Sequence, residues 1–249
     1  MAYGYRVFTQ IKRPPPALVA RFVEIITPSE TDIMGKAGTP DLADVMQNAG
    51  VVDRSIGPIY QPMACFAGPA VTVSVPTSSF FVSKMAMDLT EPGDVLVMTA
   101  RGSTDYALLG GNICKGLKQR GLAGLVADGA VRDAEQMREI GLPVHARGLA
   151  TGFNFGPKGQ GEVNVPVAFG HCVIFPGDII VGDEQGVVVI PPAHAEEILG
   201  SVAGLIESHA RIQPILERGE VTNIAAIRKA LVDTQCVFVD MHWRRQTDF

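Results

Sequence analysis

The chain has 249 residues, of which 47% are hydrophobic and 19% charged, and its formal net charge at pH 7 is −5. This composition excludes an intrinsically disordered protein, and the length favours one domain with extensions over two domains. The negative net charge gives no reason to expect a nucleic-acid partner, because such proteins usually carry a strongly basic face. We interpret the short basic segment His242–Arg245 as a solvated tail or a subunit contact.

The sequence also carries no sign of export or membrane insertion. Residues 1–16 lack the apolar core of a secretory signal, and no apolar run approaches the ~20 residues that span a bilayer. Cys65, Cys114, Cys172 and Cys236 are widely spaced and form no Cys-x-x-Cys pair. This usage is typical of reduced thiols, so we expect a cytoplasmic protein with no membrane partner.

The first half of the chain alternates between helical and strand patterns. Pro14–Pro16 form a stiff segment, and apolar residues at helical spacing follow it. Helices are expected over residues 17–26, 31–34, 41–47, 83–89 and 112–120. Strands are expected over residues 68–75, 95–98 and 122–127, with turns at 91–94 and 128–129.

The second half becomes mostly strand after one more helix. Helices are expected over residues 133–140, 193–216 and 224–231. Strands are expected over residues 144–148, 163–169, 172–175, 179–181 and 187–190, with a glycine-rich loop at 149–162. Pro92-Gly93-Asp94 recurs as Pro176-Gly177-Asp178 before an apolar strand, and we interpret both as turns.

This order of elements predicts the fold class. Helices and strands alternate in the centre and strands dominate later, which indicates an α/β fold in layers with a mixed sheet. No Gly-x-Gly-x-x-Gly motif follows a strand, so dinucleotide binding is unsupported.

Two segments carry the most informative chemistry. Gly110, Gly111, Asn112 and Ile113 form a glycine-rich turn that opens a predicted helix, and a later apolar strand ends on the pair Arg132–Asp133. Helix-terminal amides, a guanidinium and a carboxylate can surround one small anion. One carboxylate suffices for Mg²⁺ or Mn²⁺, because Mg²⁺ keeps several waters and takes further ligands from its substrate. The set is equipped to hold a 2-oxo acid beside a divalent metal.

Each part of this set also has an interpretation without a ligand. Asp133 stands three residues before Gln136, and this spacing fits a capping box. Arg132 fits a solvated or salt-bridged arginine. The glycine turn fits a tight turn in which Asn112 caps the following helix. The residues alone leave both interpretations open.

Several other polar residues are weaker candidates. They are Asp105, Cys114, His145, Lys158, His171, Asp183 and Glu184. The histidines are candidate bases, and the ordinary alternative for each is a structural role. Lys158 is a candidate for a second substrate carboxylate, and Asp183 or Glu184 for an acid supplied to a neighbouring subunit. No thiolate nucleophile is proposed at Cys114, because no neighbouring residue is suited to activate it.

The motifs resemble those of the RraA-like family, which includes the class II 4-hydroxy-4-methyl-2-oxoglutarate/4-carboxy-4-hydroxy-2-oxoadipate aldolases. Gly111 is separated by twenty residues from Arg132–Asp133, within the matching segment 124–133. The segments 142–148, 176–183 and 186–191 match as well, and the resemblance covers roughly residues 17–216. The chain departs from the aldolase motif at Gln136, where the family pattern Arg-Asp-x-x-Glu/Asp has an acid.

The resemblance implies a swivelling β/β/α-type layered domain, assembled as a homotrimer or homohexamer with sites at subunit interfaces. It divides the chain into an N-terminal extension (1–16), an RraA-like catalytic domain (17–216) and a C-terminal helical extension and tail (217–249). By the same resemblance, the amides of the turn at 110–113 hold the 2-oxo acid. Arg132 binds substrate, Asp133 ligates Mg²⁺ or Mn²⁺, and both are catalytic.

The reaction implied by the resemblance is metal-dependent retro-aldol cleavage of a 4-hydroxy-2-oxo acid, which releases pyruvate and is often accompanied by oxaloacetate decarboxylation. Two alternatives stay open. One is a non-catalytic RraA-type regulator that binds another protein, favoured by the changed residue Gln136. The other is a metal-dependent decarboxylase of a related oxo acid.

Overall fold

The computed structural model describes residues 6–27, 37–76, 80–154, 161–220 and 222–238. The chain divides into two compact units, residues 1–206 and 207–249, which are described separately. The expected helix at 31–34, Lys158 and the basic segment at 242–245 lie outside the described residues.

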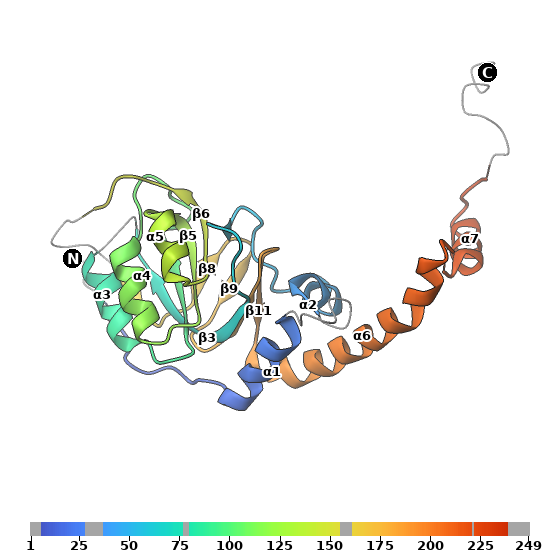
Figure 1. Ribbon diagram of the computed structural model, residues 1–249, viewed down its shortest axis with the longest axis horizontal. Helices are drawn as coiled ribbons and strands as arrows, with labels where there is room; N and C mark the ends of the chain where they lie inside the picture. Colours follow the sequence, from blue (N-terminus) through green and yellow to red (C-terminus); the bar gives the residue numbers. More distant parts are fainter. Residues whose placement is uncertain (1–5, 28–36, 77–79, 155–160, 221, 239–249) are drawn as a thin grey trace, which may run out of the picture. The chain divides into compact units, whose positions relative to one another are not determined.

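The first unit is built on a mixed sheet of nine strands (Figure 1). These strands are β1 (Arg6–Val7), β2 (Gly57–Pro58), β3 (Phe66–Ser74), β4 (Val95–Thr99), β5 (Gly124–Val131), β6 (Val144–Leu149), β7 (Glu162–Val163), β10 (Ile179–Gly182) and β11 (Val187–Ile190). Strands β3 to β6 are parallel neighbours, whereas β7, β10 and β2 add antiparallel pairs. The predicted α/β fold with a mixed sheet is confirmed.

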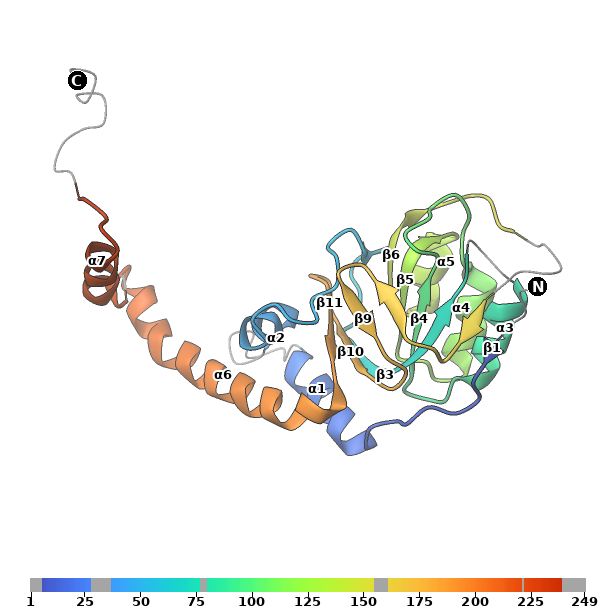
Figure 2. The same ribbon diagram turned by 180° about the vertical axis from the view of Figure 1, so that it is seen from behind.

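The two faces of the parallel strands carry different layers. Helices α3 (Phe80–Leu89), α4 (Gly111–Gln119) and α5 (Ala134–Ile140) lie together on one face (Figure 1). The β10–β11 hairpin and the pair β8 (Val167–Phe169) and β9 (Cys172–Ile174) lie on the other (Figure 2). Helices α1 (Pro16–Ile26) and α2 (Thr39–Val45) share an apolar cluster with β10 and β11.

Strand β4 shows why these residues form a central strand. Leu96 and Met98 join the apolar cluster beneath α3, α4 and α5, whereas Val95 and Val97 join the cluster on the opposite face. Both faces are therefore covered, and a strand covered on both faces needs a continuous apolar run instead of an alternating one.

Strand β5 is longer than the sequence predicts. The turn expected at Asp128–Gly129 is wrong, because the strand continues to Val131. Its pairing with β6 shifts register between Ala127 and Ala130. This register shift is a β-bulge, and the strand continues beyond it to the carboxyl edge of the sheet.

The single strand expected over residues 163–169 is also wrong. Strand β7 ends at Val163, and β8 begins at Val167. Between them Asn164 adopts a φ of +57°, a left-handed conformation that asparagine tolerates better than most residues. Pro166 also lacks the amide that a ladder needs.

The two Pro-Gly-Asp segments are turns, as predicted. Gly93 and Gly177 adopt φ values of +89° and +91°. In each turn the aspartate side chain accepts a hydrogen bond from the amide three residues earlier, at 2.8 Å for both Asp94 and Asp178. The aspartates therefore stabilise the turns that begin β4 and β10.

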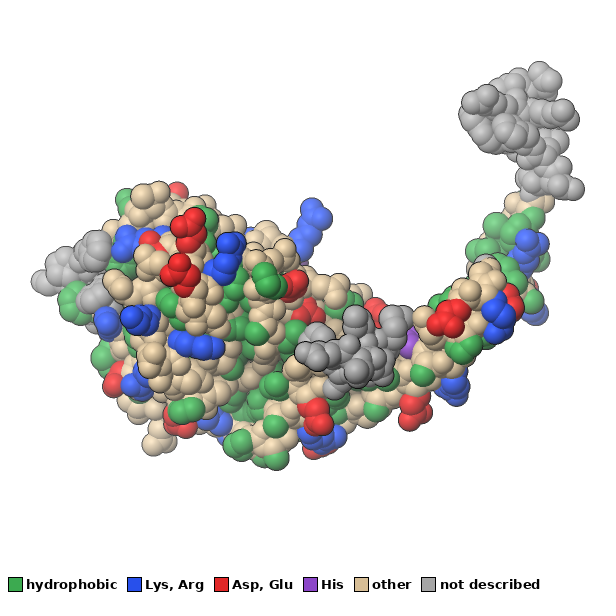
Figure 3. Space-filling model, in the orientation of Figure 1, with side chains coloured by type: hydrophobic (Ala, Val, Ile, Leu, Met, Phe, Trp, Pro, Cys, Tyr) green, Lys and Arg blue, Asp and Glu red, His purple; other side chains and the backbone are tan. Residues whose placement is uncertain are grey.

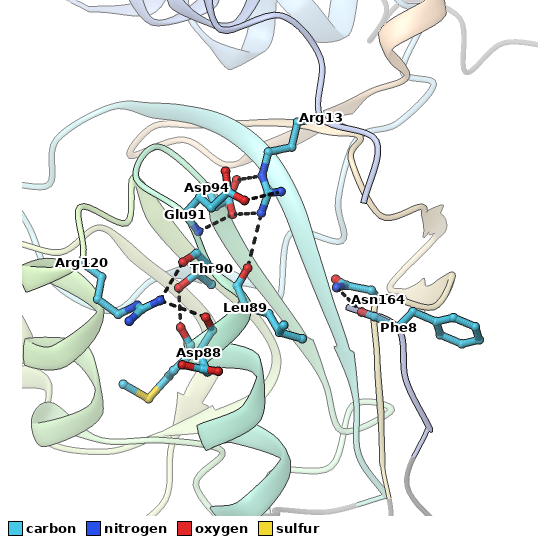
Figure 4. Close-up of polar contacts among 10 residues, drawn as sticks. Phe8, Arg13, Asp88, Leu89, Thr90, Glu91, Asp94, Arg120 and Asn164 are labelled. Carbon is cyan, nitrogen blue, oxygen red and sulfur yellow. Dashed lines mark hydrogen bonds and ion pairs between the residues drawn. The ribbon is translucent and has the colours of Figure 1, made fainter. Parts of the chain in front are cut away.

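One turn also anchors the N-terminal segment (Figure 4). The Arg13 guanidinium donates to both Asp94 carboxylate oxygens, from Nε at 3.0 Å and from Nη2 at 2.8 Å. Nη1 of Arg13 lies 2.9 Å from a Glu91 carboxylate oxygen. Asp94 is only 1% exposed, so this bidentate contact compensates a buried charge. A second attachment is the Asn164 side chain, which donates to the Phe8 carbonyl at 2.7 Å.

Helix α6 (Ala195–Glu217) follows a short 3₁₀ turn and crosses the boundary between the two units. Its first turns bury Ala195, Ile198, Leu199 and Val202. Within the second unit, α7 (Ile224–Asp233) buries none of its side chains, and Lys229 pairs with Asp233 at 2.7 Å.

The charged side chains of the first unit show no segregation by sign on the face drawn in Figure 3, where basic and acidic groups are mixed. Among the described residues, no helix is both long enough and apolar enough to cross a membrane. The four cysteines are free thiols.

We predict that Arg13→Ala lowers the free energy of unfolding by about 2 kcal/mol, because it leaves the buried Asp94 carboxylate without its guanidinium. Urea-induced unfolding measures the change. The control is Arg21→Ala, which removes an ion pair whose partners Arg21 and Glu196 are 50% and 70% exposed, so its loss stays below about 1 kcal/mol. Equal losses in the two variants would contradict this anchor.

Candidate functional site

The topology brings the glycine turn and the Arg-Asp pair together. The Leu108 amide donates to the Ala130 carbonyl at 2.8 Å, and the Arg132 amide donates to the Leu109 carbonyl at 3.1 Å. The segment before the turn therefore runs beside the end of β5. Gly110 and Arg132 follow directly from this pairing, at the carboxyl edge of the parallel strands, where ligands of open α/β sheets bind.

The Asp133 side chain points to α4 and not to its own helix. Its carboxylate oxygen Oδ2 accepts a hydrogen bond from the Gly111 amide at 3.0 Å. Asp133 occupies the N-cap position of α5 with φ 64° and ψ 44°, and its side chain makes no capping bond. The capping-box interpretation with Gln136 is therefore wrong, because a capping residue needs an extended backbone and Asp133 is left-handed.

Close approach explains why both turn positions are glycine. A Cβ on Gly110 would lie 2.4 Å from Asp133 Oδ2 and 2.9 Å from Arg132 Cγ. A Cβ on Gly111 would lie 2.2 Å from Gln136 Oε1. Gly110 has φ −141°, so the contact distance and not a left-handed backbone requires glycine there.

The amides of the turn have different partners. The Gly111 amide is taken by Asp133, and the Ile113 amide donates to the Gly110 carbonyl at 3.1 Å. The Asn112 amide makes no hydrogen bond with the described residues. Gly110 and not Asn112 occupies the N-cap position of α4, so the interpretation of Asn112 as the helix cap is wrong.

The Arg132 side chain lies over the site and is 34% exposed. Its Nε atom is 3.8 Å from Asp133 Oδ2. Its guanidinium carbon lies 5.0 Å from the centroid of the Phe153 ring, within the range of a cation–π contact. The sequence carries no signal for this role of Phe153, which lies in the segment 149–162 that is expected to be a glycine-rich loop.

Asp133 is the one candidate metal ligand of the set, with 37% of its side chain exposed. Among the described residues, no group of three or more His, Cys, Asp or Glu side chains is arranged to hold a metal ion. A lone carboxylate fits Mg²⁺ or Mn²⁺ only if waters and substrate oxygens supply the remaining ligands. The donor set is thus compatible with such an ion and incompatible with a closed structural zinc site.

A cavity of about 490 Å³ opens between α4 and α5 beside the turn. Gly111, Asn112, Lys115, Gln136 and Glu139 are among its lining residues. Arg132 and Asp133 are not among its lining residues.

Asp183 and Glu184 both have structural hydrogen-bond partners. The Asp183 carboxylate accepts four hydrogen bonds, from the amide and hydroxyl of Thr39 and from the amides of Gln185 and Gly186. The Glu184 carboxylate accepts from the Met63 amide at 2.7 Å. These bonds hold the β10–β11 turn against the preceding loops, so neither carboxylate lies with the Arg-Asp pair.

The remaining weaker candidates do not join the site as reactive groups. Asp105 is exposed and contacts Ser103 at 3.3 Å. His171 is 80% exposed and lies 3.6 Å from Asp53. Cys114 is buried near Asp133, and this burial raises the pKa of its thiol to about 12, which agrees with the absence of a proposed thiolate.

His145 is fully buried in β6, where its Nε2 atom lies 2.8 Å from the Asp183 carbonyl oxygen. The other ring nitrogen, Nδ1, is buried and has no hydrogen-bond partner among the described residues. Burial lowers the pKa of His145 to about 4, although the Asp183 carbonyl opposes this effect. His145 is therefore a neutral core residue and not a base at the site.

A second polar cluster lies at the same edge of the sheet. The buried Asp128 carboxylate pairs with the Arg147 guanidinium and accepts from the Thr99 hydroxyl at 3.1 Å. Arg147 also donates to the Ser55 hydroxyl. The cluster ties the ends of β4, β5 and β6 to the loop before β2, and the sequence offered no local signal for it.

Known proteins resemble this chain in sequence. A family model described as RraA-like, aldolase/RraA, matches residues 39–189. A 4-hydroxy-4-methyl-2-oxoglutarate aldolase of Thermus thermophilus is 34% identical over 159 residues, which cover 63% of this chain and 93% of that protein. A protein of Halalkalibacterium halodurans, provisionally named as the same aldolase, is 36% identical over 66% of this chain and 76% of its own length.

Solved structures resemble the fold as well. Streptomyces coelicolor RraAS2, described as an unusual member of the RNase ES inhibitor RraA protein family, superposes with a TM-score of 0.66 at 27% identity. The match covers 82% of this chain and 100% of that chain.

We predict that Gly110→Ala lowers the free energy of unfolding by about 1–3 kcal/mol, since the added methyl group must displace Arg132 or Asp133. Thermal or urea unfolding measures the loss. Gly200→Ala is the matched control, because nothing lies within 4 Å of its Cβ position in α6 and alanine favours a helix. A Gly110→Ala variant as stable as the wild type would show that the close approach is absent.

We also predict a pH dependence that arises from His145. Its pKa is about 4 in the folded chain, below the value of 6.5 for an exposed histidine. Between these values the unfolded chain binds the proton more strongly, so the stability contributed by neutral His145 is present above about pH 6.5 and lost as the pH falls toward 4. The loss is on the order of 3 kcal/mol.

The measurement is urea unfolding of the wild type and of His145→Gln at several pH values. Glutamine does not titrate, so the stability difference between the two proteins should shrink as the pH falls from 7 to 4.5. A difference that is constant across this range would contradict a buried neutral histidine.

Proposed function

The chain belongs to the RraA-like family, and on that premise we propose that it is a divalent-metal-dependent carbon–carbon lyase that cleaves a 4-hydroxy-2-oxo acid and releases pyruvate. The observation that carries the proposal is the contact between the Gly111 amide and the Asp133 carboxylate at 3.0 Å. It joins the Asp133 carboxylate to the helix N-terminus at the carboxyl edge of the sheet, and the Arg132 Nε atom lies 3.8 Å from the same carboxylate oxygen.

Asp133 is the proposed metal ligand. One of its oxygens, Oδ2, is held by the Gly111 amide, which orients the carboxylate so that the other oxygen is available to Mg²⁺ or Mn²⁺. The bound ion would act as a Lewis acid toward the negative charge that develops on the keto oxygen.

Arg132 is the proposed substrate-binding and catalytic partner of Asp133. Its planar guanidinium matches a carboxylate or a developing oxyanion in geometry and charge. The helix N-terminus formed by Gly110, Gly111, Asn112 and Ile113 favours an anion at the same place, and the Asn112 amide is the donor best placed to bind it.

The reaction itself needs charge stabilisation at this point. In retro-aldol cleavage the 4-hydroxyl group loses its proton and becomes a carbonyl group, the bond between C3 and C4 breaks, and the electron pair of that bond moves toward the keto oxygen, so the C4 fragment leaves as a carbonyl compound. Protonation at C3 then yields pyruvate. Decarboxylation of oxaloacetate also moves an electron pair toward the keto oxygen. The same site therefore serves both reactions, with aldol cleavage as the main activity and decarboxylation as the side activity.

The assembly belongs to this proposal too. We place the site in a catalytic domain of residues 17–216, flanked by extensions at 1–16 and 217–249, within a homotrimer or homohexamer. The partially exposed Arg132 and Asp133 side chains leave room for a neighbouring subunit to complete the pocket.

The test is pyruvate release from 4-hydroxy-4-methyl-2-oxoglutarate and from oxaloacetate, with Mg²⁺ or Mn²⁺ and with EDTA. We predict that Asp133→Asn lowers kcat/KM by about a hundredfold or more, because a metal ion contributes several kcal/mol of charge stabilisation. Asparagine tolerates the left-handed backbone of Asp133, so the variant keeps its fold. Turnover that survives both EDTA and Asp133→Asn would refute the metal-dependent mechanism.

A second candidate function is a non-catalytic regulator that binds another protein. The observation that favours it is a largely apolar cavity of about 480 Å³, whose lining includes Val173 and Phe175, each 53% exposed. Stoichiometric capture of one protein, lost in Phe175→Ser and accompanied by no turnover on a panel of oxo acids, would favour the regulator over the lyase.

A further inference from the structure

The Phe153 ring lies against the guanidinium of Arg132. The Arg132 guanidinium carbon is 5.0 Å from the ring centroid, whereas its Nε atom is 3.8 Å from the Asp133 carboxylate. The aromatic face is a close, flat surface able to set the plane of this group.

The same backbone that positions the glycine turn also positions Phe153. Ala107, just before the turn, forms parallel bridges both to Ala130 in β5 and to Phe153. The Ala107 amide donates to the Gly152 carbonyl at 2.8 Å. Backbone pairing thus links residues 152–153, the segment before the turn and the end of β5.

We infer that Phe153 is a positioning residue, which holds the Arg132 guanidinium in the orientation that binds the carboxylate of the oxo acid. The inference rests on the proposed function. An arginine side chain has many rotamers, and fixing it before binding removes part of the entropic cost of ordering it on the substrate. Phe153 itself needs no contact with the reacting atoms.

The first experiment compares Phe153→Leu and Phe153→Tyr with the wild type, by oxaloacetate turnover at saturating Mn²⁺ and by oxalate titration in the presence of Mg²⁺. For Phe153→Leu, KM and the oxalate Kd rise about fivefold, in line with a partly exposed cation–π contact, and kcat stays within about twofold. Phe153→Tyr restores both values, because tyrosine keeps the aromatic face.

The matched control is Phe238→Leu. In the second unit, the Arg228 guanidinium carbon lies 5.5 Å from the centroid of the Phe238 ring, so this substitution removes the same type of contact from a pair that includes neither Arg132 nor Phe153. It leaves KM and the oxalate Kd unchanged.

A double-mutant cycle separates positioning from general packing. In an Arg132→Ala background, Phe153→Leu changes the oxalate Kd by less than about twofold, because the group that Phe153 orients is gone. An equal fivefold effect with and without Arg132 would overturn the inference and assign Phe153 a packing role.

The two proposals fail in different ways. If the wild type turns over oxaloacetate or binds oxalate and Phe153→Leu matches it in KM and Kd, only the positioning role is overturned. If the wild type neither turns over oxo acids nor binds oxalate, the proposed function fails and the positioning role fails with it.

Discussion

The hydrogen bond from the Gly111 amide to the Asp133 carboxylate is the contact on which the arrangement of the site depends. It joins the first residue of α4 to the residue before α5. The contact requires a left-handed backbone at Asp133 and the absence of a side chain at Gly110. Each feature carries a conformational cost, and the surrounding sheet and helices hold both in place. Loss of either feature would break the contact between the Asp133 carboxylate and the Gly111 amide.

The parallel topology makes this contact possible. Strands β4 and β5 are adjacent and end at the same edge, and the segment between β4 and α4 then runs beside the end of β5. The glycine turn and the Arg132–Asp133 pair are twenty residues apart in sequence but adjacent in space. The partly exposed Arg132 and Asp133 side chains lie at this edge, while apolar clusters cover the two faces of the sheet.

Much of the fold could be predicted from local patterns. The apolar run of β4 and the helical spacing of α1 have strong periodic signals, and the two Pro-Gly-Asp turns have a local chemistry that the structure reproduces. The proximity of Gly111 to Arg132–Asp133 was expected from the motif spacing. The direction of the Asp133 side chain could not be predicted, because the spacing Asp-x-x-Gln also fits a capping box. Only the backbone conformation of Asp133 excludes that alternative.

Other features had no local signal. The bulge near Asp128 depends on pairing with β6, the buried Asp94 depends on Arg13, and the contact of Phe153 with Arg132 depends on Ala107. Each joins residues distant in sequence, so no spacing rule predicts it. The departure at Gln136 also acquires a meaning only in three dimensions, where its side chain packs against Gly111.

The central claim is that Asp133 and an oxo acid share one divalent ion. Electron paramagnetic resonance of Mn²⁺ with ¹⁷O-enriched oxalate tests it most directly, because ¹⁷O bound to the metal broadens the Mn²⁺ lines. We expect the wild type to bind Mn²⁺ with ¹⁷O broadening, and Asp133→Asn to lose both. Equal Mn²⁺ binding by the two proteins, or bound Mn²⁺ without broadening, would contradict the shared site.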